Sequence, residues 1–339
     1  MNSKKVQLLK TKRIKNASTV LLEMLTEELG NMLEENILTL EDPHEYRLAL
    51  RINTENFDKL LKLIECSIQC QDTIMREALP GKIKLVVTLT YLATGMSYRS
   101  LSHLYRVSKP SISLFIPEVC RAIYAALKQY IKFPETKEGW KIIIENGFRT
   151  KWNFPLCYGS IDGKHVEIKA PWKSGSQFFN YKKNKYSIVF LAVADHNYCF
   201  TYIDVGASGS ASDGGVFKNC SLHQYLENGF LPENGVMVGD AAFPLKKYLI
   251  KPYPGVNLSA EQKIFNYRLS RARRIVENAF GILVSRFRIF EKPISTNLST
   301  VDAIRRSRRD EITPLQSIAN QGSNHSAEAR EKRDLYKKI

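Results

Sequence analysis

Four acidic residues stand where a carboxylate is unusual, and together they could supply oxygen ligands: Asp162, Asp213, Asp240 and Glu277. Asp162 and Asp240 each close an apolar run, whereas Asp213 follows a stretch rich in Gly and Ser. Glu277 lies at the edge of the apolar stripe of a predicted helix. Mg²⁺ and Mn²⁺ prefer oxygen ligands, and two ions about 3.5–4 Å apart can promote phosphodiester transfer. The four acids therefore predict a site for divalent cations.

Two of these acids also have an ordinary explanation in the turns and caps of the chain. Asp162 and Gly163 form one of the strongest β-hairpin signals, so a tight turn alone could account for this aspartate. Asp213 could cap the N-terminus of a helix that begins at Gly214. Both alternatives stay open when each residue is considered by itself.

The other two acids have local explanations as well. Asp240 could form an Asx turn or cap the segment that follows it, although Asp is a poor strand residue and its neighbours before it are apolar. Glu277 could pair with Arg273 or Arg274 on its own helix. A partly buried Glu is costly unless it is paired, so an ion pair or a metal would each satisfy it.

Basic charge surrounds these acids. The chain has 339 residues and a formal net charge of +16, which favours a polyanionic partner. Residues 263–292, around Glu277, contain eight Lys or Arg and two Glu. Lys182, Lys183 and Lys185 are further candidates for phosphate contacts. A solvated basic face is the alternative interpretation of both groups.

The elements that must position the acids form a mixed α/β pattern. Four successive strands are predicted over residues 154–161, 164–170, 186–195 and 199–207, and a short fifth strand over 235–240. Helices are predicted over 213–229 and from Ala260 to Phe287. Hairpins followed by alternating strands and helices indicate a mixed five-stranded sheet flanked by helices.

Residues 56–132 are predicted to be helical. One helix over 82–95 ends at Gly95, the next begins after Ser97, and a third spans 108–131. Three helices with short connections match a helix-turn-helix outline, and an ordinary helical bundle gives the same outline. Pro117 would kink the third helix, which weakens its case as a recognition helix.

Composition predicts the remaining organisation. We expect a basic arm and an acidic helical segment over 1–60, a helical region over 61–150, a domain carrying the acids over 151–300, and a charged tail over 301–339. Six scattered cysteines predict free thiols rather than a zinc site. No run approaches the roughly 18 apolar residues of a membrane span, so we expect no membrane association.

Five motifs, in order, resemble the DDE endonuclease of PIF/Harbinger transposases and the Harbinger-derived nucleases of animals: SIDGKHVEI, FNYKKNKYSIVFLAVAD, GSASDGGVF, VGDAAFPL and RRIVENAFGILVSRFRIF. The resemblance covers about residues 80–300. It implies an RNase H-like DDE nuclease fold, with Asp162, Asp240 and Glu277 as catalytic metal ligands and Asp213 as a further ligand. It also implies a Mg²⁺ or Mn²⁺ cofactor, DNA as substrate and a separate DNA-binding partner protein. The expected location is the nucleus, with the cytoplasm as a second compartment.

One departure from the family leaves a second function open. After Phe290 the family continues through an apolar helix, whereas this chain has the charged stretch STVDAIRRSRRDEITPLQS. The leading hypothesis is a metal-dependent DNA endonuclease. The alternative is a domesticated, catalytically inactive DNA-binding or adaptor protein, and a small-molecule metallophosphoesterase would fit the acids but not the charge of +16. The oligomeric state is left open.

Overall fold

The computed structural model describes residues 42–72, 74, 77–134, 136–143, 147–172, 174–232, 234–294 and 327–338. The chain divides into two compact units, Met1–Ile116 and Pro117–Ile339. The predicted basic arm and most of the segment after residue 294 lie outside the described residues. The domain borders predicted at residues 60, 150 and 300 stay predictions.

Unit 1 is helical, and the predicted helix signals at Gly95 and Ser97 are present in it. It contains α2 (Pro43–Leu50), α3 (Thr54–Ile68), α4 (Gly81–Thr94), α5 (Tyr98–Tyr105) and the first half of α6 (Lys109–Leu127). Ser97 caps α5 through its side chain, and Gly95 ends α4 with a left-handed φ of 65°. The three predicted helices are therefore present. Their use as a helix-turn-helix stays a prediction.

Helix α6 continues through Pro117 and is followed by the 3₁₀ helix η1 (Lys128–Tyr130). Among the described residues, the stretch Lys109–Tyr130 is long and apolar enough to cross a membrane by length and composition. The expectation that no stretch approaches a membrane span is therefore wrong for this helix. One such helix is weak support for a membrane protein, because core helices of soluble proteins pass the same test.

Unit 2 is built on a mixed sheet with the strand order β2-β3-β1-β5-β6, and β4 pairs with β3. The strands are β1 (Cys157–Glu167), β2 (Phe179–Asn180), β3 (Lys185–Ala194), β4 (Phe200–Ser208), β5 (Val236–Val238) and β6 (Leu249–Ile250). β1 runs antiparallel to β3 and parallel to β5. The mixed sheet is confirmed, and the described sheet has six strands rather than the predicted five.

The hairpin interpretation of Asp162 and Gly163 is wrong. Strand β1 runs through both residues without a turn, since Asp162 pairs with Ala192 and Gly163 with Leu191 in a ladder to β3. The predicted strands 154–161 and 164–170 thus merge into one. Pairing with a distant strand outweighs the local Asp-Gly turn preference here.

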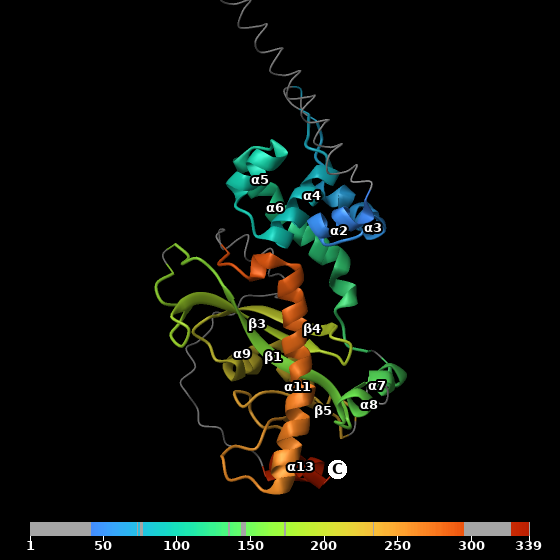
Figure 1. Cartoon of the computed structure of the whole chain (residues 1–339), viewed down its shortest axis with the longest axis vertical. Coiled ribbons are helices and arrows are strands. Elements are labelled where there is room, and N and C mark those ends of the chain that lie inside the picture. Colours follow the sequence, from blue (N-terminus) through green and yellow to red (C-terminus); the bar gives the residue numbers. More distant parts are fainter. Residues whose placement is uncertain are drawn as a thin grey trace, which may run out of the picture. The chain divides into compact units, whose positions relative to one another are not determined.

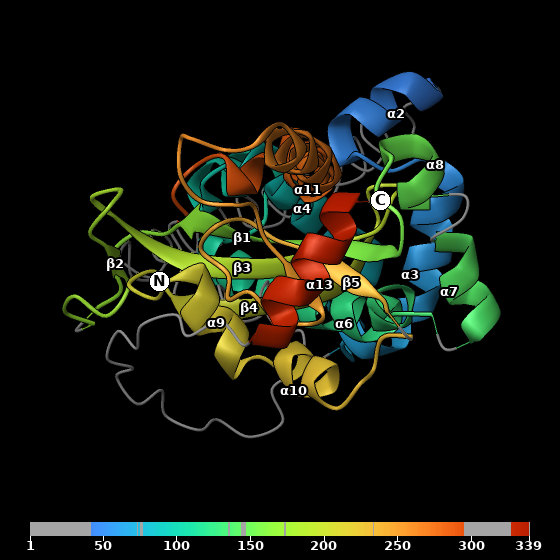
Figure 2. The same cartoon turned by 90° about the horizontal axis from the view of Figure 1, so that it is seen from below.

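Two helical layers cover the sheet, as Figure 2 shows, with α11 on one side and α9 and α10 on the other. These helices are α9 (Asp213–Asn219), α10 (Ser221–Glu227) and α11 (Ala260–Arg286). The predicted helix over 213–229 is interrupted at Cys220, whose backbone is extended. Apolar residues of β1, β3 and β5 form a core with α9 and α10 that includes Ile161, Leu191 and Phe217.

Shorter helices and one later helix complete the unit: α7 (Lys137–Ile143), α8 (Arg149–Trp152), η3 (Arg288–Phe290) and α13 (Ala327–Lys338). Figure 1 shows α13 beside the first turns of α11. Tyr336 of α13 is buried and stacks on Phe154, with ring centroids 5.7 Å apart. The segment predicted as a tail therefore ends in a helix that packs on the sheet unit.

Candidate active site

Asp162 lies on the face of β1 that is covered by α11. Side chains alternate along a strand, so Ser160, Asp162 and Lys164 share one face. Ser160 Oγ donates a hydrogen bond to the carbonyl of Arg273 on α11 (3.0 Å). The Lys164 ammonium lies 6.0 Å from the ring centroid of Phe280, also on α11. Asp162 therefore faces α11 between these two contacts.

Glu277 lies at the same level on the facing helix. Ser160 contacts Arg273 of α11, and Lys164 contacts Phe280. Asp162 lies halfway between these two strand residues, and Glu277 lies about halfway between the two helix residues. The Glu277 side chain is 43% exposed, and its Oε1 lies 2.6 Å from Nη1 of Arg273. The ion pair predicted as the alternative partner of Glu277 is thus present.

Asp240 follows β5 and lies next to Asp162. In the parallel ladder, Ser160 pairs with Val238, so two further residues on each strand bring Asp162 and Asp240 side by side. Asp240 Oδ1 accepts a hydrogen bond from the amide of Ala242 (2.8 Å). The Asx turn predicted as an alternative is therefore present, and it leaves the second oxygen of Asp240 for another partner.

Asp213 approaches the same place from the opposite face of β1. It is the first residue of α9, whose N-cap is Ser212, so the N-cap interpretation of Asp213 is wrong. A Cβ added to Gly163 would collide with Asp213 Oδ1, and one added to Gly214 would lie 2.7 Å from the carbonyl oxygen of Ala242. The two glycines thus provide space for three acid-bearing segments to meet.

Burial and mutual repulsion raise the pKa values of two of the acids. Burial above all, together with the charges of Asp240 and Asp213, raises the pKa of Asp162 to about 6, against the opposing effects of the Gly163 amide and Arg273. Burial and the charge of Asp240 raise the pKa of Asp213 to about 6, against Lys182 and Lys183. Like charges held close together disfavour ionisation, as is typical of a site that binds cations.

The residues present fit a hard divalent cation. Asp213 Oδ1 is buried and has no hydrogen-bond partner among the described residues. A buried oxygen of this kind is costly unless something binds it, and a cation surrounded by carboxylates would do so. Among the described residues, the trio whose ligand atoms lie within 4.8 Å of one another is Asp42, His44 and Glu45 at the start of α2, so the acids of this site stand farther apart than that.

Basic residues of the β2–β3 turn face the acids. Lys182 and Lys183 act electrostatically on Asp213, and both of their backbone amides donate to Asn180 Oδ1 (2.9 and 3.1 Å). Lys185, the third predicted phosphate contact, instead pairs with Glu167 at 2.6 Å. Two of the three predicted lysines therefore lie in this turn and act on the carboxylates.

Sequence reasoning missed Lys251. Its Nζ donates to the carbonyl of Ala241 (3.3 Å), the residue after Asp240, and Asp240 acts on it electrostatically. Lys251 directly follows β6, and β6 runs parallel to β5. The signal that could have identified it is its place at the carboxyl end of a parallel strand, where α/β proteins gather ligands.

Comparisons with known proteins relate this chain to a family of nucleases. Residues 161–307 match a family described as DDE superfamily endonuclease, and this segment contains all four acids. "Protein ALP1-like" of Arabidopsis thaliana is 24% identical over 266 residues, which are 73% of this chain and 64% of that protein. "Putative nuclease HARBI1" of Mus musculus is 25% identical over 232 residues, which are 68% of this chain and 65% of that protein.

The human protein with the same name is 24% identical over an equal length. This chain thus spans less than two thirds of the length of these relatives. No solved structure matches the chain. The similarities confirm the resemblance to the Harbinger-derived nucleases that the five motifs predict.

Proposed function

From the match of residues 161–307 to the DDE superfamily endonucleases, we propose that this chain is a metal-dependent DNA endonuclease derived from a Harbinger-type transposase. One observation carries the proposal. Asp162, Asp213 and Asp240 come from three separate segments to one place, where burial and repulsion raise the pKa of the first two to about 6. A fold tolerates such a cost where a functional site requires it.

In this proposal, Asp162 and Asp240 hold Mg²⁺ or Mn²⁺, and Asp213 and Glu277 complete the ligands. When bound there, the ions would lower the pKa of the attacking water or 3′-hydroxyl and offset charge on the leaving oxygen. The ion pair with Arg273 holds the Glu277 side chain in place on α11, and a bound cation would have to share this carboxylate with the guanidinium.

The lysines would hold the DNA. Lys182 and Lys183 stand on a turn ordered by Asn180, and they already act electrostatically on Asp213. Burial and the charge of Lys183 lower the pKa of Lys164, so a phosphate between these two ammonium groups would relieve their repulsion. The chain thereby orients the phosphodiester against the carboxylates.

The sheet supports the finer fold proposal of an RNase H-like nuclease. Its first three long strands, β1, β3 and β4, form an antiparallel ladder, and β5 and β6 continue beside β1 in parallel. This arrangement places Asp162 in the central strand and Asp240 at the end of the neighbouring one. Both acids then lie at one edge of the parallel part of the sheet.

DNA targeting is a further part of the proposal. Exposed Arg99 and Arg106 of the α5 region and Lys109 at the start of α6 suit backbone contacts of a helix-turn-helix-like element. We expect a separate DNA-binding partner protein and action in the nucleus, with the cytoplasm as a second compartment. These expectations rest on the family resemblance.

The test is nicking of supercoiled plasmid by the purified chain with Mg²⁺, Mn²⁺, Ca²⁺ or EDTA. We expect nicking with Mg²⁺ or Mn²⁺, none with EDTA, and loss of at least about a hundredfold in Asp162→Asn and Asp240→Asn, since each removes a ligand charge.

Asp195→Asn is the matched control. Asp195 follows β3 and accepts hydrogen bonds from the amides of Asn197 and Cys199, which an Asn side chain can also accept. Its nicking rate should equal that of the unchanged chain. Undiminished nicking by Asp162→Asn would refute the catalytic assignment.

The second candidate function is a DNA-binding or adaptor protein that does not cleave. The ion pair of Glu277 with Arg273 favours it, because a structural partner already satisfies this carboxylate. Salt-dependent DNA binding without nicking under any of these metals would support the adaptor.

A further inference from the structure

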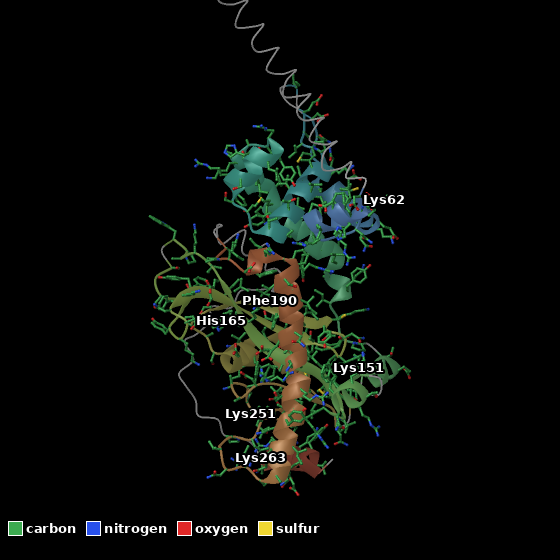
Figure 3. The ribbon with its side chains drawn as sticks, in the orientation of Figure 1. Lys62, Lys151, His165, Phe190, Lys251 and Lys263 are labelled. Atoms are coloured by element: carbon green, nitrogen blue, oxygen red, sulfur yellow. The ribbon has the colours of Figure 1, made fainter. Side chains whose placement is uncertain are left out.

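Lys251 is a cation fixed beside the acids, and its surroundings disfavour its charge. Its Nζ is anchored to the carbonyl of Ala241, so the ammonium stays next to the loop that follows Asp240. Burial and the charge of Arg333 lower the pKa of Lys251, and Asp240 opposes this shift. In Figure 3, the labelled Lys251 lies at a level nearer the start of α11 than the labelled His165 does.

Arg333 of α13 reaches the same place from a distant part of the sequence. Its guanidinium carbon lies 3.9 Å from the ring centroid of Tyr253, which follows Lys251 by two residues. Prolines at 252 and 254 favour an extended backbone on either side of this tyrosine. Arg333 is thus held against Tyr253, which is two residues from Lys251 in the same extended segment.

The anchoring of Arg333 leaves part of it without a partner. The Tyr253 hydroxyl donates to the carboxylate of Asp334, so the nearest acid of α13 is already engaged. Arg333 Nε is buried and has no hydrogen-bond partner among the described residues. Tyr253 also acts on Arg333 through a side-chain hydrogen bond. The Nε–H that remains beside a second cation favours an acceptor, above all an anionic one.

We propose that Lys251 and Arg333 form a phosphate-binding subsite beside Asp240, and that its ligand is a backbone phosphate of nucleic acid next to the phosphodiester held by the carboxylates. Tyr253 provides the flat surface that orients the guanidinium, and α13 supplies the arginine. An Arg fork binds a phosphate through two donors, whereas a Lys contributes a point charge. The choice of nucleic acid as the ligand rests on the proposed function, whereas the anion-binding subsite itself does not.

The test measures binding of a fluorescent DNA duplex to the full chain in EDTA, so that no cleavage is needed. Anisotropy titrations at several salt concentrations give the affinity and its dependence on salt. We expect Lys251→Met and Arg333→Gln each to weaken binding several-fold and to reduce the slope of log affinity against log salt by up to about one. Because both cations contact one phosphate, the double variant should lose less than the two single losses combined.

Matched variants separate charge from structure. Arg330→Gln removes the same charge from an exposed position of the same helix and should leave the slope unchanged. Arg333→Lys keeps the charge and should keep most of the slope, even if α13 packs less well. Circular dichroism and thermal unfolding identify any variant in which α13 has detached.

Each outcome decides the proposal. Equal slopes for Arg333→Gln, Lys251→Met and Arg330→Gln would overturn it, and fully additive losses would indicate two separate phosphates rather than one subsite. Inorganic phosphate could raise the melting temperature of the unchanged chain but not of the Lys251 and Arg333 variants, while all of them bind DNA equally well. The ligand would then be a free anion, and the assignment to nucleic acid would fail. A chain that binds DNA through this pair but never nicks would contradict the proposed function and leave the subsite standing.

Discussion

Asp162 is held ionised at neutral pH at the expense of stability. Its pKa is about 6 in the folded chain and near 3.8 when unfolded, so the folded state binds the proton more tightly. The contribution of this group to stability is therefore greatest at low pH and falls as the pH rises from about 4 through 6. Two pKa units correspond to roughly 3 kcal/mol, as an upper estimate.

Asp162→Asn should accordingly stabilise the chain while removing activity. At pH 7.5 in EDTA, we expect the free energy of unfolding to rise by about 1–3 kcal/mol, because the buried charge is gone. At about pH 4 the difference should largely vanish, since the aspartate is then protonated. Urea unfolding at both pH values measures it, and a variant that is less stable at both would contradict the argument.

Gly163 is required because its missing side chain leaves room for the carboxylate of Asp213. Its φ does not lie in the left-handed region, unlike that of Gly95 or Gly206, and an added Cβ would meet the carboxylate of Asp213. We expect Gly163→Ala to displace this carboxylate and to slow nicking at least about tenfold, since misplaced ligands are costly. Nicking at the unchanged rate would show that Asp213 is not needed in its present position.

Gly281→Ala is the matched control for this substitution. Gly281 is exposed in α11, and an added Cβ would meet no atom within 4 Å. Alanine favours the helix over glycine by roughly 0.5–1 kcal/mol, so this variant should unfold at a higher temperature without a change in nicking.

Among the elements, β1 and α11 carry Asp162 and Glu277, and one hydrogen bond between the strand and the helix helps to fix their relative position. Ser160 Oγ donates to the carbonyl of Arg273 across this interface. Ser160→Ala should cost about 1 kcal/mol of stability and reduce nicking, because the strand can then shift along the helix. Ser285→Ala removes an exposed hydroxyl from the same helix and should change either quantity little. Denaturant unfolding and plasmid nicking compare the pair.

Helices were more predictable from the sequence than strands were. Helix α11 begins at the predicted Ala260 and ends one residue before the predicted Phe287, because its Ser259 cap and its apolar stripe are local signals. β1 was divided wrongly at Asp162, because its continuity depends on pairing with β3, which lies far along the chain. A local turn preference cannot report such a distant partner.

The candidate site shows the same limit. The four acids could be identified by type and place, and the ordinary explanation of each could then be tested against the geometry. Lys251 and Arg333 were not singled out, because they lie on distant parts of the sequence and meet only beside Tyr253. Only the folded chain shows that α13 returns to the sheet.

At the scale of the whole molecule, α13 connects the far end of the described chain to the sheet unit. Tyr336 stacks on Phe154 and donates to the carbonyl of Asn234 (3.0 Å), and Lys247 pairs with Glu328. Deletion of residues 327–339 uncovers the buried surface around Phe154. We expect the melting temperature to fall by roughly 5–10 °C, at about 2–4 °C for each kcal/mol lost.

Lys247→Ala serves as the control for the deletion. It removes an exposed ion pair between Lys247 and Glu328, which contributes at most about 1 kcal/mol, so its melting temperature should barely change. Differential scanning calorimetry measures both variants. An unchanged melting temperature after the deletion would show that α13 does not stabilise the unit.

Strand β1 extends well past its parallel neighbour, and this bears on how the protein behaves in solution. The described ladder to β5 stops at Ser160, whereas β1 continues to Glu167. Past Ser160 the next backbone partner on this side is Ile294, whose amide donates to the carbonyl of Glu167. The short stretch between them carries Asp162 and Lys164, and charges on a strand edge discourage pairing with another chain. Asp162→Asn would therefore make each molecule more stable and the population more prone to aggregate. The carboxylate that we propose as a metal ligand would then have a second effect, which is to oppose association of two copies along this edge.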